Sequence, residues 1–514
     1  MKIARRTTVR LAAASLLVAG IGLGSLPSAA QTAQAPRLRA GGPPSVGELK
    51  VLAGSFHDHT TDSDGDAPSS MVAEYVRVHR EELGLDFASL TEHSDFFPAT
   101  PSTAGPNPWQ RSRAVTDANT TPGFTMLRGF EWTNDQQNHL NVIESKNWIN
   151  RFVAGEAALT MTPFWDWLAT TPVGDNAGTG TAIGGADGIG QFNHPSSKGA
   201  LNWDDYAFHA GAAEAMATIE VRENARGWYW FALSKGWTVG PVMNADYHPW
   251  AAELVINNTA PGAACGRGKN GATGAPGFYD CERSLVAAEG NSRAEIVAAL
   301  KARRTAASDR PDLWATLRAP GGVWMGSTVQ TSPGETVVLE VDAGTDQSAL
   351  AKVEIVRDGV VGDFTHFYGE NNECIPADPV RDPRPGCSQH LPSYEEQRRR
   401  YDASSGMTTR KGGIDEPPTG TKGAPVSLAG TRATVTVPVV VPTTPSTRPD
   451  GKHFFYAIVT RADGSRVLTA PVFTSPDAQP VVPEAPSVVL LPVVAVLLGA
   501  GAWSVARRRS RHAA

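Results

Sequence analysis

The sequence contains few cysteines, and its four lack the C-x-x-C spacing of a cysteine-rich structural zinc site. They form two local pairs, Cys265 with Cys281 and Cys374 with Cys387, which predict two disulfides in an oxidising compartment. A G-x-S-x-G nucleophile motif is missing, so there is no sequence sign of a serine hydrolase of that class. The stretch "GRGKNG" is no phosphate-binding loop, because its first glycine is misplaced and Asn270 replaces the required Ser or Thr.

Positive charge is scarce between the two ends of the chain. The 46 Lys and Arg include eight in residues 1–30 and 487–514, so residues 31–486 hold 38 (46 minus 8). All 52 Asp and Glu lie in that body, which gives it a net charge of −14 (38 minus 52). Such an acidic body is a poor binder of nucleic acid or anionic lipid, and no nucleic-acid partner is expected.

Long uncharged hydrophobic runs mark both ends. Residues 1–30 combine basic residues, an apolar run and small residues before a cleavage point after Ala30, as in a secretory signal peptide. A Pro-rich linker at 476–486 leads to an uncharged run at 487–506, long enough to span a membrane, and then to a basic tail at 507–514. The arginines predict a cytoplasmic tail and an exported protein anchored at the cell surface in the cytoplasmic membrane. The alternative is a buried C-terminal helix.

Residues 48–310 alternate short apolar runs with helical patterns. The strand-like runs are "ELKVLAGSF", "LDFASL", "FTMLRGF", "HLNVIE", "GIGQFN", "ATIEVR" and "WTVGPVMNA". Helices are predicted at 68–83, 162–170, 227–236 and 292–304. This alternation predicts an α/β fold, either a parallel barrel or an open sheet.

Residues 312–475 change to alternating strands joined by "DGS"-type turns, which predicts a small antiparallel β domain of sandwich type. An irregular Pro-, Arg- and Gly-rich insert at 370–423 interrupts it.

Acidic and histidine side chains recur where the strands of 48–310 end, and one starts a strand. The candidate metal ligands are His57, His59, Asp64, His93, Glu131, His139, His194, Asp246 and His248. In a parallel barrel these strand ends converge on one mouth, where active sites lie. Taken singly, His194 is more often a turn or core histidine, and Asp64 a turn residue. Asp62 and Asp66 are interpreted as solvent-facing turn residues.

Imidazole and carboxylate ligands without cysteine suit zinc, manganese or iron. Eight or nine ligands exceed the needs of one ion, so two or three divalent ions are expected, with Glu131 bridging two of them. Such a cluster generates a metal-bound hydroxide at neutral pH and needs no serine or cysteine nucleophile.

The motifs "HDHTTDSDG", "LTEHSD", "GFEW", "HLNVI", "NHPS", "IEVREN" and "NADYH" resemble, in order, those of the PHP superfamily, named after polymerase and histidinol phosphatase. The resemblance covers roughly residues 50–310 and implies a distorted seven-stranded (β/α) barrel with metal-dependent phosphoesterase chemistry. Secreted two-domain members with a trailing β domain also resemble the carbaryl-hydrolase branch, which cleaves carbamate esters. One departure is that the usual T-D-H is Thr91-Glu92-His93, so the role of the acidic residue is open.

The resemblance also implies how the ligands divide among three ions. The first set is His57, His59, Glu131 and Asp246. The second set is Glu131, His139 and His194. The third set is Asp64, His93 and His248.

The leading hypothesis is therefore an exported, membrane-anchored, multinuclear metal-dependent phosphoesterase acting on a small-molecule ester. Arg222 and Lys198 are candidate contacts for the substrate anion, as are Arg303 and Arg304 unless these two only favour a helix C-terminus.

Two alternatives remain. A carboxyl or carbamate ester hydrolase would use aromatic residues near the motifs as an apolar pocket. These are Phe96, Phe97, Trp228, Tyr229, Trp230 and Trp250. A non-catalytic surface binding protein would use its β domain for binding and the barrel as a scaffold.

Overall fold

The computed structural model describes the chain from residue 43 to residue 475 with gaps. The described residues are 43–64, 80, 84–97, 106–134, 137–151, 161–174, 184–195, 202–221, 226–244, 246, 282–359, 409–410, 413–414, 416–418 and 420–475. Several predictions fall outside them. These are the signal peptide, Asp66, the helix at 68–83, most of the 370–423 insert, the linker, membrane span and basic tail, all four cysteines, and Lys198, Arg222, His248 and Trp250. Among the described residues, no helix is long and apolar enough to cross a membrane.

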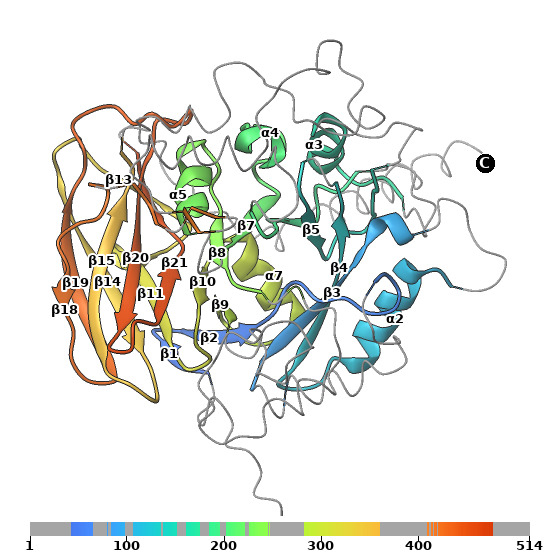
Figure 1. The fold of residues 1–514 in the computed structure, drawn as a ribbon, viewed down its shortest axis with the longest axis horizontal. Coiled ribbons are helices and arrows are strands. Elements are labelled where there is room, and N and C mark those ends of the chain that lie inside the picture. The colour runs from blue at the N-terminus through green and yellow to red at the C-terminus, as the bar shows by residue number, and fades with distance from the viewer. Residues whose placement is uncertain are drawn as a thin grey trace, which may run out of the picture.

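One large sheet runs through both predicted domains (Figure 1). Its first strands are β1 (Ser45–Val46), β2 (Leu49–Gly54), β3 (Phe87–His93), β4 (Thr125–Trp132), β5 (Leu140–Ile143), β6 (Ile189–Phe192), β7 (Met216–Glu220) and β8 (Gly240–Val242). The seven predicted strand runs coincide with β2 to β8. β9 (Arg283–Ala288) and β10 (Thr305–Ser308), which the sequence analysis did not predict, continue the sheet beyond β2.

The strand directions differ from those of a parallel barrel, which was one of the two predicted forms. β2, β3 and β4 are parallel, and so are β6, β7 and β8. β5, in contrast, is antiparallel to both β4 and β6. The start of β5 therefore lies at the same edge as the ends of its neighbours, which brings His139 to the edge where the other candidate ligands lie.

The far end of this strand series returns to its beginning, because β8 contacts β9 and β10. Ser284 on β9 joins the end of β8: its hydroxyl contacts Met243 O at 3.1 Å and Asn244 Oδ1 at 2.7 Å. The result is a curled, mixed α/β arrangement with few helices, which agrees with the predicted fold class at that level.

Helices cover the curled sheet. They are α2 (Pro108–Asn119), α3 (Thr162–Ala169), α4 (Asn202–Tyr206), α5 (Arg226–Ser234) and α7 (Arg293–Lys301), with the 3₁₀ turns η3 (Ser94–Phe96) and η6 (Pro320–Gly322). The predicted helices at 162–170, 227–236 and 292–304 correspond to α3, α5 and α7. α2 was not among the predicted helices, although Asn107 and Gln110 form a capping box and Pro108 occupies its first turn.

An aromatic core fills the space between the sheet and α3, α4 and α5. It includes Trp132, Phe164, Trp165, Phe192, Trp203, Tyr206 and Trp237. Phe97, Trp228, Tyr229 and Trp230 are buried in the same core, so these four stabilise the fold rather than line an open substrate pocket.

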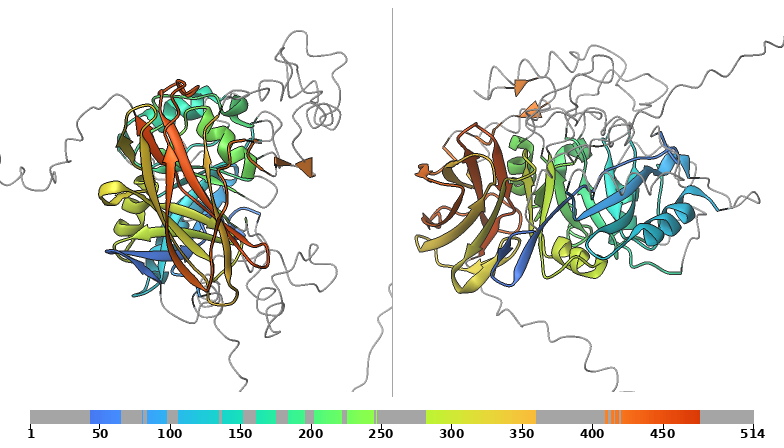
Figure 2. Two further views of the ribbon diagram at one scale, coloured as in Figure 1. Left: turned by 90° about the vertical axis from the view of Figure 1, so that its left-hand side faces the viewer. Right: turned by 90° about the horizontal axis from the view of Figure 1, so that it is seen from below.

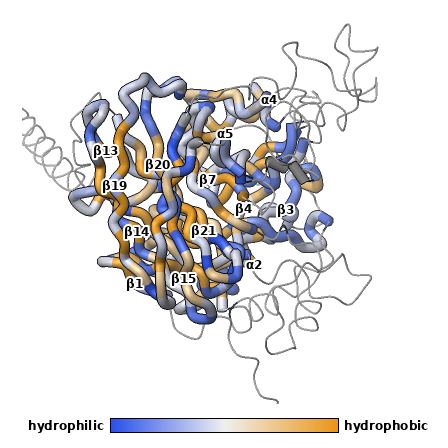
Figure 3. The backbone as a smooth tube through the Cα atoms, turned by 60° about the vertical axis from the view of Figure 1, so that its left-hand side comes forward, coloured by the Kyte–Doolittle hydropathy of each residue, from blue (hydrophilic) through white to orange (hydrophobic). Residues whose placement is uncertain are grey.

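The C-terminal part of the chain forms a second set of strands (Figure 2). They are β11 (Trp314–Ala319), β12 (Val323–Trp324), β13 (Thr328–Gln330), β14 (Thr336–Gly344), β15 (Leu350–Arg357), β16 (Thr409–Arg410), β17 (Gly413–Ile414), β18 (Val426–Ser427), β19 (Arg432–Val440), β20 (His453–Arg461), β21 (Arg466–Thr469) and β22 (Val472–Ser475). β12, β11, β14 and β19 form a four-stranded sheet. This sheet shares a hydrophobic core with β15, β20 and β21. Figure 3 shows hydrophobic stretches along β14, β15, β20 and β21.

The two predicted domains are joined by backbone pairing. β21 pairs antiparallel with β10, with Ala306 opposite Thr469 and Ser308 opposite Val467. The large sheet thus passes from the curled part into the C-terminal part without a break. The predicted boundary near 311 lies between β10 and β11.

Candidate metal centre

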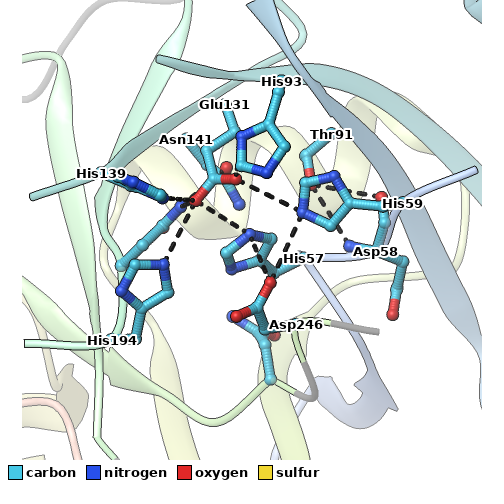
Figure 4. A network of polar contacts seen from close by, with 12 residues as sticks. His57, Asp58, His59, Thr91, His93, Glu131, His139, Asn141, His194 and Asp246 are labelled. Carbon is cyan, nitrogen blue, oxygen red and sulfur yellow. Dashed lines mark hydrogen bonds and ion pairs between the residues drawn. The ribbon is translucent and has the colours of Figure 1, made fainter. Parts of the chain in front are cut away.

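The candidate ligands come together at one edge of the curled sheet (Figure 4). His57 and His59 follow β2, and His93 and Glu131 lie at or near the ends of β3 and β4. His139 precedes β5, His194 follows β6, and Asp246 follows β8. Side chains separated by up to 189 positions in the sequence therefore face one another.

Glu131 lies at the centre of the cluster, with five histidines around its carboxylate. Its Oε1 is 3.1 Å from His57 Nε2, 3.1 Å from His139 Nδ1 and 3.3 Å from His194 Nε2. Its Oε2 is 3.3 Å from His59 Nε2 and 2.9 Å from His93 Nδ1. This central position suits a carboxylate that bridges two ions.

Asp246 closes the cluster on the side of β8. Its Oδ1 lies 3.3 Å from His57 Nε2 and 3.5 Å from His59 Nε2. Within the described residues, three overlapping sets offer ligand atoms within 4.8 Å of one another. The sets are His57, Glu131, His194; His57, His59, Asp246; and His59, His93, Glu131.

The grouping agrees only in part with the one that the resemblance implies. His57, His59 and Asp246 belong together, as the first implied set requires. His93 joins His59 and Glu131, while its Nε2 also lies 3.4 Å from Asp64 Oδ2, its partner in the third implied set. Asp64 is the most open of these groups, with 43% of its side chain exposed.

The electrostatics of the cluster couple the carboxylates to the imidazoles. Burial opposes the charged form of His57, but Glu131, Asp246 and Glu220 outweigh it and raise the pKa of this histidine. For His93, burial is likewise outweighed by Glu131 and Asp64, which raise its pKa to about 10. Burial raises the pKa of Glu131, but His57, His93 and His139 outweigh it and hold that pKa well below its usual value. The carboxylate is therefore ionised at the centre of a buried ring of bases.

His139 behaves differently from His57 and His93. Burial lowers its pKa, and the nearby His194 and His93 add to this effect against the attraction of Glu131. A neutral imidazole is the form that ligates a metal ion.

Three buried atoms of the cluster test whether the residues fit a metal. His57 Nε2, His139 Nε2 and Glu131 Oε2 are buried and make no hydrogen bond of good geometry within the described part of the chain, although His57 Nε2 and Glu131 Oε2 lie within 3.1 Å of a charged neighbour in the cluster. Buried polar atoms without a partner cost free energy, and native proteins retain them where a ligand satisfies them. Imidazole nitrogens and a carboxylate oxygen are the donors that zinc, manganese and iron accept, so the set fits divalent ions.

Glu220, at the end of β7, holds two of the histidines. Its Oε1 lies 2.8 Å from His57 Nδ1, and its Oε2 accepts a hydrogen bond of 2.6 Å from His194 N. With Nδ1–H donated to a carboxylate, His57 presents the lone pair of Nε2 to the cluster. Glu220 had no role among the sequence predictions, because its contact with His57 spans 163 positions.

Asparagines also support the centre and were missed in the sequence. Asn193 Nδ2 donates to Glu131 Oε1 at 2.8 Å and to Asn141 Oδ1 at 2.9 Å. Asn138 Nδ2 donates to His194 O at 3.3 Å. "QFNH" and "QNHLN" place these amides beside ligands, which is the only sequence signal they give.

Strained backbone gathers around the centre. Asn138, His194 and Asp246 have φ values of 78°, 28° and 54°, in the left-handed region that non-glycine residues rarely adopt. The adjacent α4 is left-handed over most of its length, with φ between 41° and 57° at Asn202, Trp203, Asp204 and Tyr206. Such strain occurs mainly at functional sites, where the surrounding structure enforces it.

Two other expectations change. Arg303 is buried, and its guanidinium donates to the backbone oxygens of Lys301, Ala213 and Glu214, so it does not receive a substrate anion. Asp62 is not a free turn residue, because it forms an ion pair of 2.6 Å with Arg111 of α2. Lys198 and Arg222 stay predictions, since both lie outside the described residues.

Comparison with known proteins gives weak likenesses only. No family model matches the sequence, and no curated protein matches it significantly. Among solved structures, the chain is similar to a two-domain protein from Bacteroides vulgatus described as containing a predicted PHP-like metal-dependent phosphoesterase. The identity is 14%, the TM-score 0.35, and the alignment covers 84% of this chain and 97% of that one.

A putative membrane-anchored protein from Corynebacterium diphtheriae aligns over 40% of this chain and 46% of that one, at 13% identity and a TM-score of 0.15. At these TM-scores neither alignment establishes a shared fold. Function is therefore inferred from the geometry of the centre.

Proposed function

We propose that the chain is a multinuclear metal-dependent hydrolase of ester bonds, and specifically a phosphoesterase. The observation that carries this proposal is the ring of five histidines around the buried, ionised Glu131, closed by Asp246. Its donors are those of a catalytic centre with two or three ions.

The candidate ligands would divide between two neighbouring ions. His57, His59 and Asp246 would hold one ion, and Glu131 with His194 and His139 a neighbouring one. Divalent ions held there supply Lewis acidity and lower the pKa of a coordinated water. Glu220 keeps Nδ1 of His57 protonated, so that Nε2 stays directed into the cluster.

The preference for phosphoesters rests on the sequence. The ordered motifs resemble those of a phosphoesterase superfamily. Arg222 lies in the motif that bears Glu220, and Lys198 lies four residues after His194. Guanidinium and ammonium groups bind phosphate oxygens through charge-assisted hydrogen bonds. An acidic body leaves anion recognition to these groups and to the metal ions.

The test uses the full-length chain loaded separately with zinc, manganese and iron. Turnover of nitrophenyl phosphate monoester, phosphodiester, acetate and carbamate is compared for wild type, His57→Ala and His209→Ala, a half-exposed histidine outside the cluster. We expect phosphoester turnover that falls at least about 100-fold in His57→Ala and stays unchanged in His209→Ala. Metal-loaded protein that cleaves none of the four substrates would contradict the enzyme proposal and favour the surface binding protein.

A carboxyl or carbamate ester hydrolase is the second candidate, because one aromatic side chain beside the centre is open. Phe96 is 54% exposed, and its ring centroid lies 6.3 Å from that of His93. An exposed aromatic ring at this place would contact an apolar group of a substrate. Turnover of acetate or carbamate alone, reduced in Phe96→Ala through a higher KM, would assign the protein to this class.

We also propose that the chain is exported and anchored by residues 487–506, with the metal centre outside the cell. The support is the signal-like segment at 1–30 and the uncharged run before four arginines. Cell fractionation tests this: the full chain should sediment with membranes and be digested by protease added to intact cells. Deletion of 487–514 should release it into the medium.

A further inference from the structure

Glu92 stands where the resembling motifs have aspartate, and its buried side chain supports the loop after β2. Both carboxylate oxygens lie 3.1 Å from Thr60 N, and Oε1 accepts from Thr60 Oγ1 at 2.7 Å. Oε2 accepts a 2.6 Å hydrogen bond from Ser63 Oγ. All of these partners are donors, so the carboxylate acts as an acceptor in every contact.

Ser63 connects this carboxylate to a candidate ligand. Its Oγ lies 3.3 Å from His59 Nδ1. A serine hydroxyl has one proton to donate, and here Ser63 donates it in the hydrogen bond to Glu92. Ser63 can therefore only accept a hydrogen bond from His59, which requires that Nδ1 carries the proton. Asp64 Oδ1, 3.9 Å from the same nitrogen, favours this arrangement as well.

This arrangement determines which group the opposite ring nitrogen, Nε2 of His59, offers to the cluster. His59 Nε2 lies 3.3 Å from Glu131 Oε2 and 3.5 Å from Asp246 Oδ1, and His59 belongs to two of the three ligand sets. With the proton on Nδ1, the lone pair of Nε2 points at the centre of the cluster.

We propose that Glu92 and Ser63 form a relay that fixes the tautomer and ring orientation of His59 for metal binding. The inference rests on the proposed metal centre and assigns two further positioning residues to it. His57 has a direct carboxylate partner in Glu220, whereas His59 reaches its carboxylate through one hydroxyl. Partners of this kind commonly change metal affinity 10- to 100-fold when they are removed.

The near-isosteric variant Glu92→Gln reverses the relay. Its amide oxygen can still accept from Thr60, but its NH₂ group donates to Ser63 Oγ. The hydroxyl proton of Ser63 then turns to His59 Nδ1, which places the ring proton on Nε2 and directs it at the metal. We expect the affinity for Zn²⁺, measured on the full-length chain by competition with a chromophoric chelator, to fall about 10- to 100-fold.

Two companion variants separate the relay from simple loop support. Thr60→Val removes a hydroxyl that Glu92 binds outside the relay, so it should lower thermal stability and leave Zn²⁺ affinity within about twofold. Ser63→Ala should weaken Zn²⁺ binding. In the double variant, Glu92→Gln should add no further loss, because its effect reaches His59 only through Ser63. Additive losses, or wild-type affinity in Glu92→Gln, would overturn the relay.

The outcome stays decisive if a variant does not fold or if the proposed activity is missing. Should Glu92→Gln unfold, Ser63→Ala decides alone, and wild-type Zn²⁺ affinity in it overturns the proposal. Zn²⁺ binding that depends on the relay, without turnover of any ester, would retain the relay and reject the hydrolase. Turnover of an ester with unchanged Zn²⁺ affinity in both variants would retain the hydrolase and reject the relay.

Discussion

Glu131 is the side chain through which most of the charged groups of the centre interact. Five imidazoles lie within 3.3 Å of its two oxygens, and it is fully buried. A buried carboxylate among so many bases is stable only because each partner compensates the cost of its desolvation. Removing its charge should therefore weaken the binding of any ion that Glu131 would hold.

Glu131→Gln keeps the shape of this side chain and removes its charge. We expect the full chain to lose at least one bound ion and at least about 100-fold in turnover, because an amide is a poor bridging ligand. Metal-to-protein ratios after gel filtration, with turnover measured alongside, check this. Glu48→Gln, at an exposed position, is the matched control and should behave as wild type. Full metal content in Glu131→Gln would contradict the bridging role.

That the candidate ligands lie close together could be predicted from the sequence, whereas the residues that support them could not. His57, Glu131 and Asp246 stand at strand ends, and strand ends follow from local hydrophobic pattern. Glu92 and Glu220 also stand at strand ends, but their roles depend on partners 29 to 163 positions away. Arg303 is a residue for which the sequence suggested a role that the structure does not support. Its guanidinium donates to backbone carbonyls and is not available to a substrate.

At the scale of elements, the predictable part is the existence of strands, and the unpredictable part is their direction. β5 has four residues, all buried, and a buried run of that length carries no sign of which way it runs. Its antiparallel direction follows from its neighbours β4 and β6 and from the short connection that precedes it. Without that reversal, His139 would lie at the opposite edge of the sheet.

The capping box of α7 stabilises the helix that covers β9. Ser292 Oγ accepts from Glu295 N, and Glu295 Oε2 accepts from Ser292 N at 2.8 Å. We expect Ser292→Ala to lower the free energy of unfolding by about 1 kcal/mol, and Ser292→Thr to restore most of it. Denaturant unfolding measures both. Equal stability of the alanine variant would mean that the cap contributes nothing.

The turn between β20 and β21 contributes stability that depends on pH. Hydrogen bonding from Arg461 and Ser465 N lowers the pKa of Asp463 well below its usual value. A carboxyl whose pKa is depressed by folding stabilises the fold above its unfolded pKa of about 4 and loses this contribution as the pH falls. The stability difference between wild type and Asp463→Asn should therefore shrink from pH 5 to about pH 2.5. A constant difference in denaturant titrations would contradict this, and Asp346→Asn, at an exposed position, is the control.

At the scale of the whole molecule, metal bound at the proposed centre would couple the two ends of the curled sheet. Ligands from β2, β4 and β8 can share ions only in the folded chain, so binding stabilises the native state. One ion at 100 times its Kd contributes about 2.7 kcal/mol. A strong chelator should lower the Tm of the full chain by several degrees, and excess zinc should restore it. Glu131→Gln should respond less, and an equal response would place the stabilising ion elsewhere.

The pairing of β10 with β21 also sets an order of events during synthesis. β21 begins about 160 residues after β10 ends, so roughly 8 to 30 s pass between them at 5–20 residues per second. Throughout that interval, β10 has an open edge that invites pairing with another chain. A chain that ends between β10 and β21 would keep all the described candidate metal ligands but leave the edge of β10 unpaired. Because β21 covers this edge of β10, we expect a chain that lacks the C-terminal strands to aggregate more readily than the full chain.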